Sequence, residues 1–95
     1  MSDATIPDAG RPVTLRYFAW VREKAGIAEE RVLLPDGVAT VADLVDWLRT
    51  RGPGFAEAFA RDGVIRAAVD QRHVKPAAPL AGAREIAFFP PVTGG

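Results

Sequence analysis

The residues best suited to chemistry lie at the end of the sequence, where Gly94 and Gly95 follow a pair of prolines, Pro90 and Pro91. Glycines carry no side chain, so a terminal carboxylate on them can enter a narrow slot in another protein. Adjacent prolines favour extended backbone and prevent a preceding strand from continuing as an ordinary ladder. The segment beyond Pro91 reaches on the order of 13 Å when extended. We therefore expect a projecting tail whose reacting group is the α-carboxylate of Gly95.

Side chains that usually carry out catalysis are scarce in this sequence. It contains no cysteine, a single histidine, His73, and a single serine, Ser2. A nucleophilic triad needs a hydroxyl or thiol beside a base, and a zinc site needs three or four nitrogen, sulfur or oxygen ligands. The lack of cysteine also excludes disulfides. We therefore expect no metal site, no bound cofactor and no catalytic side chain.

Length and charge narrow the class of protein further. A chain of 95 residues forms one domain, and its 12 Lys and Arg balance 12 Asp and Glu. A nucleic-acid-binding protein would carry a basic excess, and no apolar run here is long enough to cross a bilayer. Residues 1–12 lack the basic and apolar segments of a secretory signal. We expect a cytoplasmic protein that binds neither nucleic acid nor membrane.

Hydrophobic periodicity predicts the elements that hold this tail. Apolar residues recur at helical spacing from Val41 to Leu48, and Thr40 with Asp43 approximates a capping box at the start of this main helix. Alternation and β-branched or aromatic content predict several strands. The expected strands are residues 13–20, 31–34, 64–69, 72–74 and 85–89, and shorter helical segments are expected at 21–25 and around Phe55 and Phe59, ending at Asp62-Gly63.

These elements predict a two-layer α+β domain, in which one long helix covers one face of a sheet. The domain is expected to span residues 13–95, with residues 90–95 as its functional tail and residues 1–12 as a flexible N-terminal extension. Asp70 and Gln71 are typical of a tight turn between two strands. The order in which the strands pair does not follow from the sequence pattern.

One face of the sheet is expected to carry exposed aromatic rings. In the first strand Leu15 and Tyr17 point toward the core, so alternation places Phe18 on the opposite face. The same reasoning places Phe89 on that face at the end of the last strand. An exposed pair of large aromatic residues often marks a surface for a partner protein. His73, on the short strand nearby, is expected at the rim of this surface.

Three segments carry a resemblance to a known family. The ending FFPPVTGG, the upstream AAVDQ and the opening LRYFAWVREKAG together resemble the small subunits of molybdopterin synthase, over Val13 to Gly95. The resemblance implies a ubiquitin-like β-grasp fold. It also implies that an ATP-using, E1-like adenylyltransferase adenylates Gly95, which becomes a thiocarboxylate with sulfur from a sulfurtransferase. The tail would then enter the large synthase subunit, in an expected heterotetramer, and donate sulfur to cyclic pyranopterin monophosphate to form the molybdopterin dithiolene.

The resemblance also implies roles for residues of this chain. Gly95 and Gly94 would form the reacting end, and the chain itself would bind no cofactor. Contacts with the partner proteins are expected from Phe18, His73, Phe89, Pro90, Pro91, Val92 and Thr93. Two positions depart from the family pattern: Asp70 stands where asparagine is usual, and residues 82–85 read Gly-Ala-Arg-Glu in place of an acidic run.

Three alternatives remain beside sulfur donation for molybdopterin. The first is sulfur donation in another pathway, as by the thiamine-type carrier, which shares the fold and the terminal glycines. That carrier typically lacks both the helical insertion after the first strand and the FFPPV arm, which are present here. The second is a ubiquitin-like protein modifier that forms isopeptide bonds through Gly95. The third is a structural module with an inert glycine-rich end.

Overall fold

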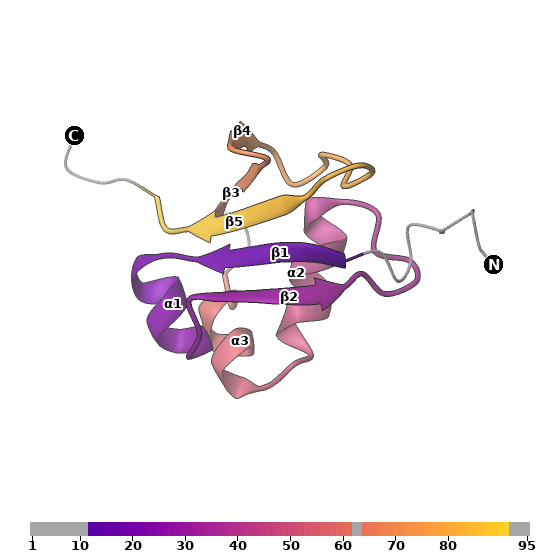
Figure 1. The fold of residues 1–95 in the computed structure, drawn as a ribbon. Coiled ribbons are helices and arrows are strands. Elements are labelled where there is room, and N and C mark those ends of the chain that lie inside the picture. The colour runs from indigo at the N-terminus through magenta and orange to yellow at the C-terminus, as the bar shows by residue number, and fades with distance from the viewer. Residues whose placement is uncertain (1–11, 62–63, 92–95) are drawn as a thin grey trace.

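The structure is a computed structural model that describes residues 12–61 and 64–91. Within these residues five strands form one mixed sheet, and three helices pack against one of its faces (Figure 1). In chain order the elements are β1 (Pro12–Tyr17), α1 (Ala19–Ala25), β2 (Glu29–Leu33), α2 (Val41–Arg49), α3 (Pro53–Ala58), β3 (Arg66–Val69), β4 (Arg72–Val74) and β5 (Glu85–Phe89). Of the extension expected over residues 1–12, only Pro12 is described, as the first residue of β1.

The strands follow the order β2-β1-β5-β3-β4 across the sheet. The first and last strands, β1 and β5, lie parallel at its centre, with Leu15 opposite Ile86 and Tyr17 opposite Phe88. Every other neighbouring pair is antiparallel. A central parallel pair with a long helix packed across the sheet is the β-grasp arrangement, which confirms the α+β prediction.

The hydrophobic core lies between the sheet and the helices. Leu15 and Tyr17 of β1 and Phe88 of β5 are at most 1% exposed, and they belong to one cluster with Leu44 and Leu48 of α2. The rings of Tyr17 and Phe88 stack with centroids 6.1 Å apart. Burial of each large apolar side chain contributes about 1.5–3 kcal/mol. The predicted inward face of the first strand is therefore confirmed.

The main helix begins as its cap residues predict. Thr40 Oγ1 accepts a 3.1 Å hydrogen bond from the backbone N–H of Asp43, and the Asp43 carboxylate accepts hydrogen bonds from the backbone N–H groups of Ala39 and Thr40. These backbone hydrogen bonds lower the pKa of Asp43. Val41, Leu44 and Leu48 are buried on the face that contacts the core. The predicted capping box is confirmed.

The first strand is shorter than predicted. It ends at Tyr17, and Trp20, which the prediction placed in the strand, lies in α1. The backbone N–H of Phe18 still donates to Phe88 O at 3.0 Å, but Ala19 has a φ of 55° and turns the chain away from the sheet. Trp20 packs against the core from the helix. Because Trp20 packs against the core from a helix as it would from a strand, its hydrophobicity did not reveal that β1 ends before it.

Three other boundaries also differ from the prediction. β2 begins at Glu29, two residues early, because pairing with β1 continues to Arg16 and an edge strand tolerates charged side chains. α3 ends at Ala58, where Arg49 Nε donates to Phe59 O at 2.7 Å and satisfies a carbonyl at the helix end. β3 begins at Arg66. The predicted stop at residues 62–63 lies outside the described residues.

The turn between β3 and β4 is confirmed at Asp70 and Gln71, whose φ values are 49° and 71°. Two positive φ angles match the tight hairpin turns that follow the twist of the strands. Asp70 Oδ1 also accepts 3.0 Å hydrogen bonds from the backbone N–H groups of Arg84 and Glu85. Asp70, which stands where the family usually has asparagine, thus connects the hairpin turn to the start of β5 through hydrogen bonds.

Candidate functional site

The described part of the tail leaves from the middle of the sheet. Phe89 ends β5, and Pro90 and Pro91 follow it outside any strand. Proline has no backbone N–H, so the β1–β5 ladder cannot extend through these two residues. Figure 1 shows this end of β5 at the left of the molecule, away from the end where β1 begins. The predicted site residues Val92, Thr93, Gly94 and Gly95 lie outside the described residues.

The sheet face opposite the helices, which we call the open face, surrounds the point where Pro90 begins. Cross-strand pairing places side chains of all five described strands on this face, since residues directly opposite one another share a face. The open face comprises Pro12, Thr14, Arg16, Glu29, Arg31, Leu33, Arg66, Ala68, His73, Glu85, Ala87 and Phe89, with Phe18 adjoining it directly after β1. The alternation-based placement of Phe18, Phe89 and His73 on one side of the sheet agrees with this register.

Phe18 is held beside the root of the tail and remains exposed. Its backbone N–H bonds to Phe88 O, one residue before Phe89, and its side chain is 40% exposed. The Arg16 guanidinium lies 5.3 Å from the centroid of the Phe18 ring, within the range of a cation–π contact. Such an exposed aromatic ring, fixed by a strand end and a cation, is suited to insertion into a partner surface.

His73 and Phe89 form a second aromatic group on the open face. Their ring centroids lie 5.1 Å apart with an interplanar angle of 50°. Ala68 and Ala87, which lie between and beside them, are 6% and 8% exposed although no helix covers them. Small side chains in the middle of the open face therefore leave room for the larger rings to meet.

Charged residues near the tail root were not singled out from the sequence. Arg16 lies 3.5 Å from Glu29 and 4.0 Å from Glu85, nitrogen to oxygen, while the Arg66 side chain forms no ion pair within the described residues. Arg66 sits directly opposite Phe89. Alternation along β1, and pairing of β3 with β5, place both arginines on the same face as Phe18 and Phe89.

A partly exposed hydrogen-bond network lies on the helix side of the sheet. Tyr17 Oη donates to Glu30 Oε2 at 2.7 Å, and Arg51 donates to both oxygens of Glu30 at 2.6 and 3.0 Å. Burial and the Glu30 carboxylate raise the pKa of Tyr17, which therefore stays protonated and donates. Burial also acts to raise the pKa of Glu30, but the hydrogen bonds from Arg51 and Tyr17 outweigh it and lower that pKa. This network fixes β1 and β2 to the end of α2.

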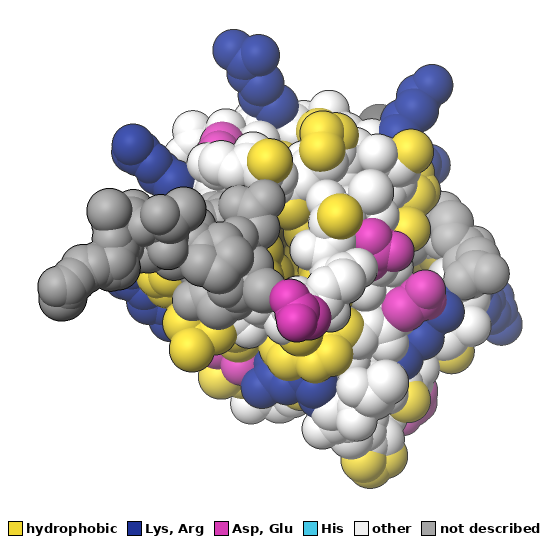
Figure 2. Space-filling view, turned by 90° about the vertical axis from the view of Figure 1, so that its right-hand side faces the viewer, with side chains coloured by type: hydrophobic (Ala, Val, Ile, Leu, Met, Phe, Trp, Pro, Cys, Tyr) yellow, Lys and Arg dark blue, Asp and Glu magenta, His cyan; other side chains and the backbone are white. Residues whose placement is uncertain are grey.

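The end of the molecule opposite the tail root has a mixed surface. In Figure 2 Lys and Arg side chains and Asp and Glu side chains lie between small groups of hydrophobic ones on the described part of that end. Within residues 12–61 and 64–91, no group of three His, Asp or Glu side chains could hold a metal ion. The helices described there are also too short and too polar to cross a membrane.

Comparison with known proteins places this arrangement in a family. Residues 15–95 match the ThiS family. The molybdopterin synthase sulfur carrier subunit of Escherichia coli (strain K12) is 37% identical over 83 residues, which cover 87% of this chain and 99% of that protein. This likeness confirms the resemblance drawn from the FFPPVTGG ending and the two upstream segments.

Solved structures show the same fold. The crystal structure of SAMP1 from Haloferax volcanii superposes with a TM-score of 0.71 at 30% identity, covering 90% of this chain and all of that one (100%). A crystal structure of small archaeal modifier protein 1 from Haloferax volcanii gives a TM-score of 0.64 at 29% identity, covering 87% of this chain and 100% of that one. With a family match from residue 15 to residue 95, the chain belongs to the ThiS family.

Proposed function

We propose that this chain is the sulfur carrier of a molybdopterin synthase and that the α-carboxylate of Gly95 carries the sulfur. The observation that supports this most is the 37% identity to the Escherichia coli sulfur carrier subunit, which extends over 99% of that protein. The described structure adds a Pro90-Pro91 arm at the end of a central strand, beside the exposed Phe18 and the half-buried Phe89. This geometry suits a domain that docks by one face and extends its terminus into a partner.

The carboxylate of Gly95 must be activated before it can accept sulfur, because a free carboxylate is a poor electrophile. In the proposed reaction an E1-like adenylyltransferase joins it to AMP from ATP and releases pyrophosphate. A sulfide-level nucleophile, released by a thiol reductant from a persulfide on a sulfurtransferase, then displaces AMP and leaves a thiocarboxylate. The carrier supplies no general base, which agrees with the absence of cysteine and the single histidine in its sequence.

The proposed acceptor reaction takes place in the large synthase subunit. There the thiocarboxylate of Gly95 is a soft nucleophile held on a short arm, so the pocket of the partner gains the advantage of proximity. The sulfur attacks cyclic pyranopterin monophosphate and displaces an oxygen substituent, which gives a thioester with Gly95. Water then hydrolyses this thioester, so the sulfur stays on the pterin and Gly95 regains its carboxylate. Each dithiolene needs two sulfurs, which fits a heterotetramer in which carriers are exchanged after each transfer.

The open face is the proposed docking surface for both partners. Phe18, His73 and Phe89 surround the root of the tail, and Arg66 lies opposite Phe89. Aromatic and arginine side chains are the residues most often responsible for binding energy at interfaces. One face would therefore serve the activating enzyme and the large subunit in turn, so the two complexes exclude each other.

Deletion of Gly95 tests the proposed role of the tail. We expect that removing Gly95, or adding one residue after it, abolishes complementation of a bacterial strain that lacks its own carrier subunit. The described domain should keep its thermal unfolding temperature, because β5 ends at Phe89. Deletion of residues 1–11 is the matched truncation and should leave complementation intact. Normal growth with either altered C-terminus would contradict the proposal.

A protein-modifying role is the second candidate, and the likeness to small archaeal modifier protein 1 favours it. The same adenylated Gly95 would then be attacked by a lysine amine, with AMP as the leaving group and an isopeptide bond as the product. Peptide mass spectrometry of cell proteins would reveal Gly95 joined to lysine side chains. Finding such linkages in cells that express this chain, and their loss when Gly95 is deleted, would support this role beside or in place of sulfur transfer.

A further inference from the structure

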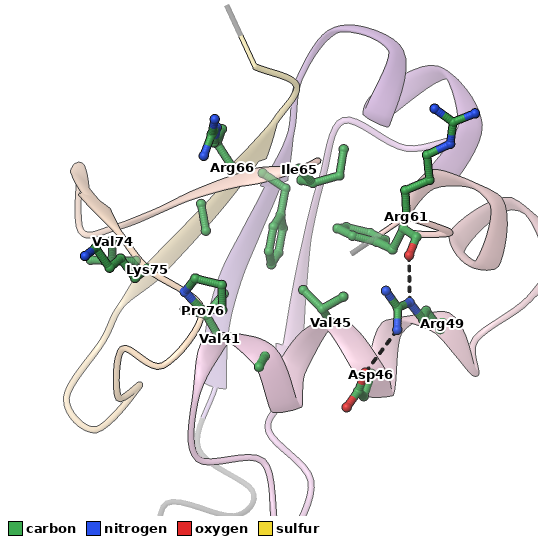
Figure 3. A pocket seen from close by; sticks show the side chains of 14 residues that line it. Val41, Val45, Asp46, Arg49, Arg61, Ile65, Arg66, Val74, Lys75 and Pro76 are labelled. Atoms are coloured by element: carbon green, nitrogen blue, oxygen red, sulfur yellow. Dashed lines mark hydrogen bonds and ion pairs between the residues drawn. The ribbon is translucent and has the colours of Figure 1, made fainter. Parts of the chain in front are cut away.

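The helix side of the molecule contains a groove that the proposed sulfur chemistry does not use. It lies between α2 and the β3–β4 hairpin and has a volume of about 430 Å³ (Figure 3). We call it the α2–β3 groove. Its apolar lining comes from Val41, Ala42, Val45, Phe59, Ile65, Ala67, Val74, Pro76 and Phe88. Pockets of this size and composition commonly hold a ligand or an anchor residue of a partner.

The charged residues that line the groove are mostly basic, and one of them, Arg66, also belongs to the open face, where it lies opposite Phe89. Asp46 is the one acid among them, and Arg49 already lies 3.2 Å from it and also donates to Phe59 O. The side chains of Arg61 and Lys75 are exposed, and neither forms an ion pair within the part of the chain that the structure describes. The rim of the groove therefore carries positive charge that the described residues do not neutralise.

The positions of these cations favour a particular kind of occupant. In Figure 3 Lys75 and Arg61 stand on opposite sides of the apolar lining, with Val45 and Ile65 between them. A single compact anion could not contact both cations and fill the apolar space at once. A peptide segment with apolar side chains in its middle and carboxylates at both flanks could do so, since its charges are spaced along a chain.

We propose that the α2–β3 groove binds an acidic, amphipathic peptide segment of a further partner protein. Apolar side chains of the segment pack against Val45 and Ile65, and its carboxylates pair with Arg61 and Lys75. The docking of an amphipathic segment into an apolar groove is a common mode of peptide recognition. Because the groove lies on the helix side of the sheet, a segment bound there leaves Phe18 and His73 of the open face free. The carrier could thus be held by one protein while its tail serves another.

The proposal predicts a defined effect of charge reversal. The probe is a synthetic peptide of about 14 residues with leucines at i, i+3, i+4 and i+7 and glutamates on both flanks. Titration into the ¹⁵N-labelled full chain should shift the amide signals of Val45, Ile65 and Val74 and saturate. The double variant Arg61→Glu/Lys75→Glu should weaken binding at least about tenfold, which corresponds to about 1.4 kcal/mol.

A matched pair of substitutions separates this site from general charge attraction. Arg22 and Arg31 are exposed cations away from the groove, and reversing both changes the net charge by the same amount. We expect Arg22→Glu/Arg31→Glu to keep the affinity within about twofold. Equal weakening by both pairs, shifts confined to the open face, or no saturation up to about 1 mM peptide would each overturn the proposal.

Two further controls complete the test. A peptide with lysines in place of the glutamates should not bind, because it would meet the basic rim with like charge. The Arg61→Glu/Lys75→Glu variant should also form the thiocarboxylate at the rate of the unaltered chain, since neither residue lies on the open face. If that variant lost both peptide binding and thiocarboxylate formation, the groove would belong to the activating-enzyme interface and the separate-partner proposal would be wrong.

Discussion

The ring of His73 lies 5.1 Å from the ring of Phe89, centroid to centroid, although strand β3 separates their strands. Ala68 of β3 is directly opposite both His73 and Ala87, and its methyl group leaves the space in which the two rings meet. Phe89, the last residue of β5, thus packs against a ring from β4, which is two strands away in the sheet. This contact places an aromatic group beside the point where Pro90 continues the chain.

Substitution of Phe18 tests whether the open face is the docking surface. We expect Phe18→Asp to weaken binding to the large synthase subunit and to the activating enzyme by at least about tenfold, because a buried interface aromatic is replaced by a charge. Since Phe18 is 40% exposed, the unfolding free energy should change by only about 0.5 kcal/mol. Isothermal titration calorimetry with each partner and thermal unfolding measure the two quantities.

Leu33 provides the matched control for Phe18. It is 63% exposed and lies on the same open face, opposite Pro12 where β1 begins, at the other end of β1 from Phe18, so Leu33→Asp adds the same charge to that face away from the tail root. Leu33→Asp should leave both affinities unchanged. If the two aspartate variants bind equally well, the aromatic group at the tail root is not part of the interface. If both variants bind equally poorly, the loss of affinity comes from the added negative charge and not from the position of Phe18 beside the tail.

Glu30 gives the protein a dependence of stability on pH. Its pKa is lowered in the folded state, so its contribution is complete above the pKa of an unfolded glutamate, about 4.3, and is lost as the pH falls through the folded value. Glu30→Gln should cost about 1–2 kcal/mol at pH 7, allowing for the partial exposure of Arg51. The difference from the unaltered chain should shrink toward pH 2 in urea unfolding experiments.

Glu23 serves as the control for this pH experiment. It is an exposed glutamate of α1 whose side chain forms no ion pair within the described residues. Glu23→Gln should change the unfolding free energy by no more than about 0.5 kcal/mol at either pH. A Glu30→Gln cost that stayed constant from pH 7 to pH 2 would show that the ionised Glu30 does not stabilise the fold.

Gly54 allows α3 to approach α1. A Cβ built at this position would lie well inside van der Waals contact with the backbone oxygen of Lys24, which cannot rotate away. Alanine would gain about 1 kcal/mol of helix propensity, but forcing the helices apart costs typically 1–3 kcal/mol. Because the obstacle is backbone, we expect Gly54→Ala to lower the unfolding free energy by about 1–2 kcal/mol and the melting temperature by several degrees.

Ala56→Ser is the control for Gly54→Ala, because it adds one heavy atom at an exposed position of the same helix. Its melting temperature should stay within about two degrees of that of the unaltered chain. A Gly54→Ala variant that melts at a higher temperature would mean that helix propensity outweighs the contact with Lys24, and that the two helices separate at little cost.

Local signals in the sequence predicted much of the fold. The main helix followed from the spacing of its apolar residues and from the Thr40–Asp43 capping box, and β5 followed from its short apolar run before two prolines. The prediction was wrong where a local signal was ambiguous. A hydrophobic residue such as Trp20 fits the core side of a helix as well as that of a strand, so its residue type could not show where β1 ends. The first residues of β2 are charged, and they are tolerated because β2 lies at the edge of the sheet.

The remaining features depend on contacts between distant parts of the chain. The parallel pairing of β1 with β5 joins the first strand to the last. The meeting of His73 with Phe89 depends on the size of Ala68, and the bond from Arg51 to Glu30 joins the end of α2 to an edge strand. The proposed tail chemistry rests on consecutive residues, whereas the α2–β3 groove and its basic rim appear only when four elements are brought together.

Mass spectrometry of the C-terminal tryptic peptide, residues 85–95, tests the central claim most directly. The protein is recovered after reaction with its activating enzyme, ATP and a sulfur source. We expect an exchange of oxygen for sulfur that fragment ions place on Gly95, since an oxidised residue elsewhere has the same nominal mass change. Gly95 found only as a plain carboxylate, while the same activating enzyme converts another carrier, would contradict the account.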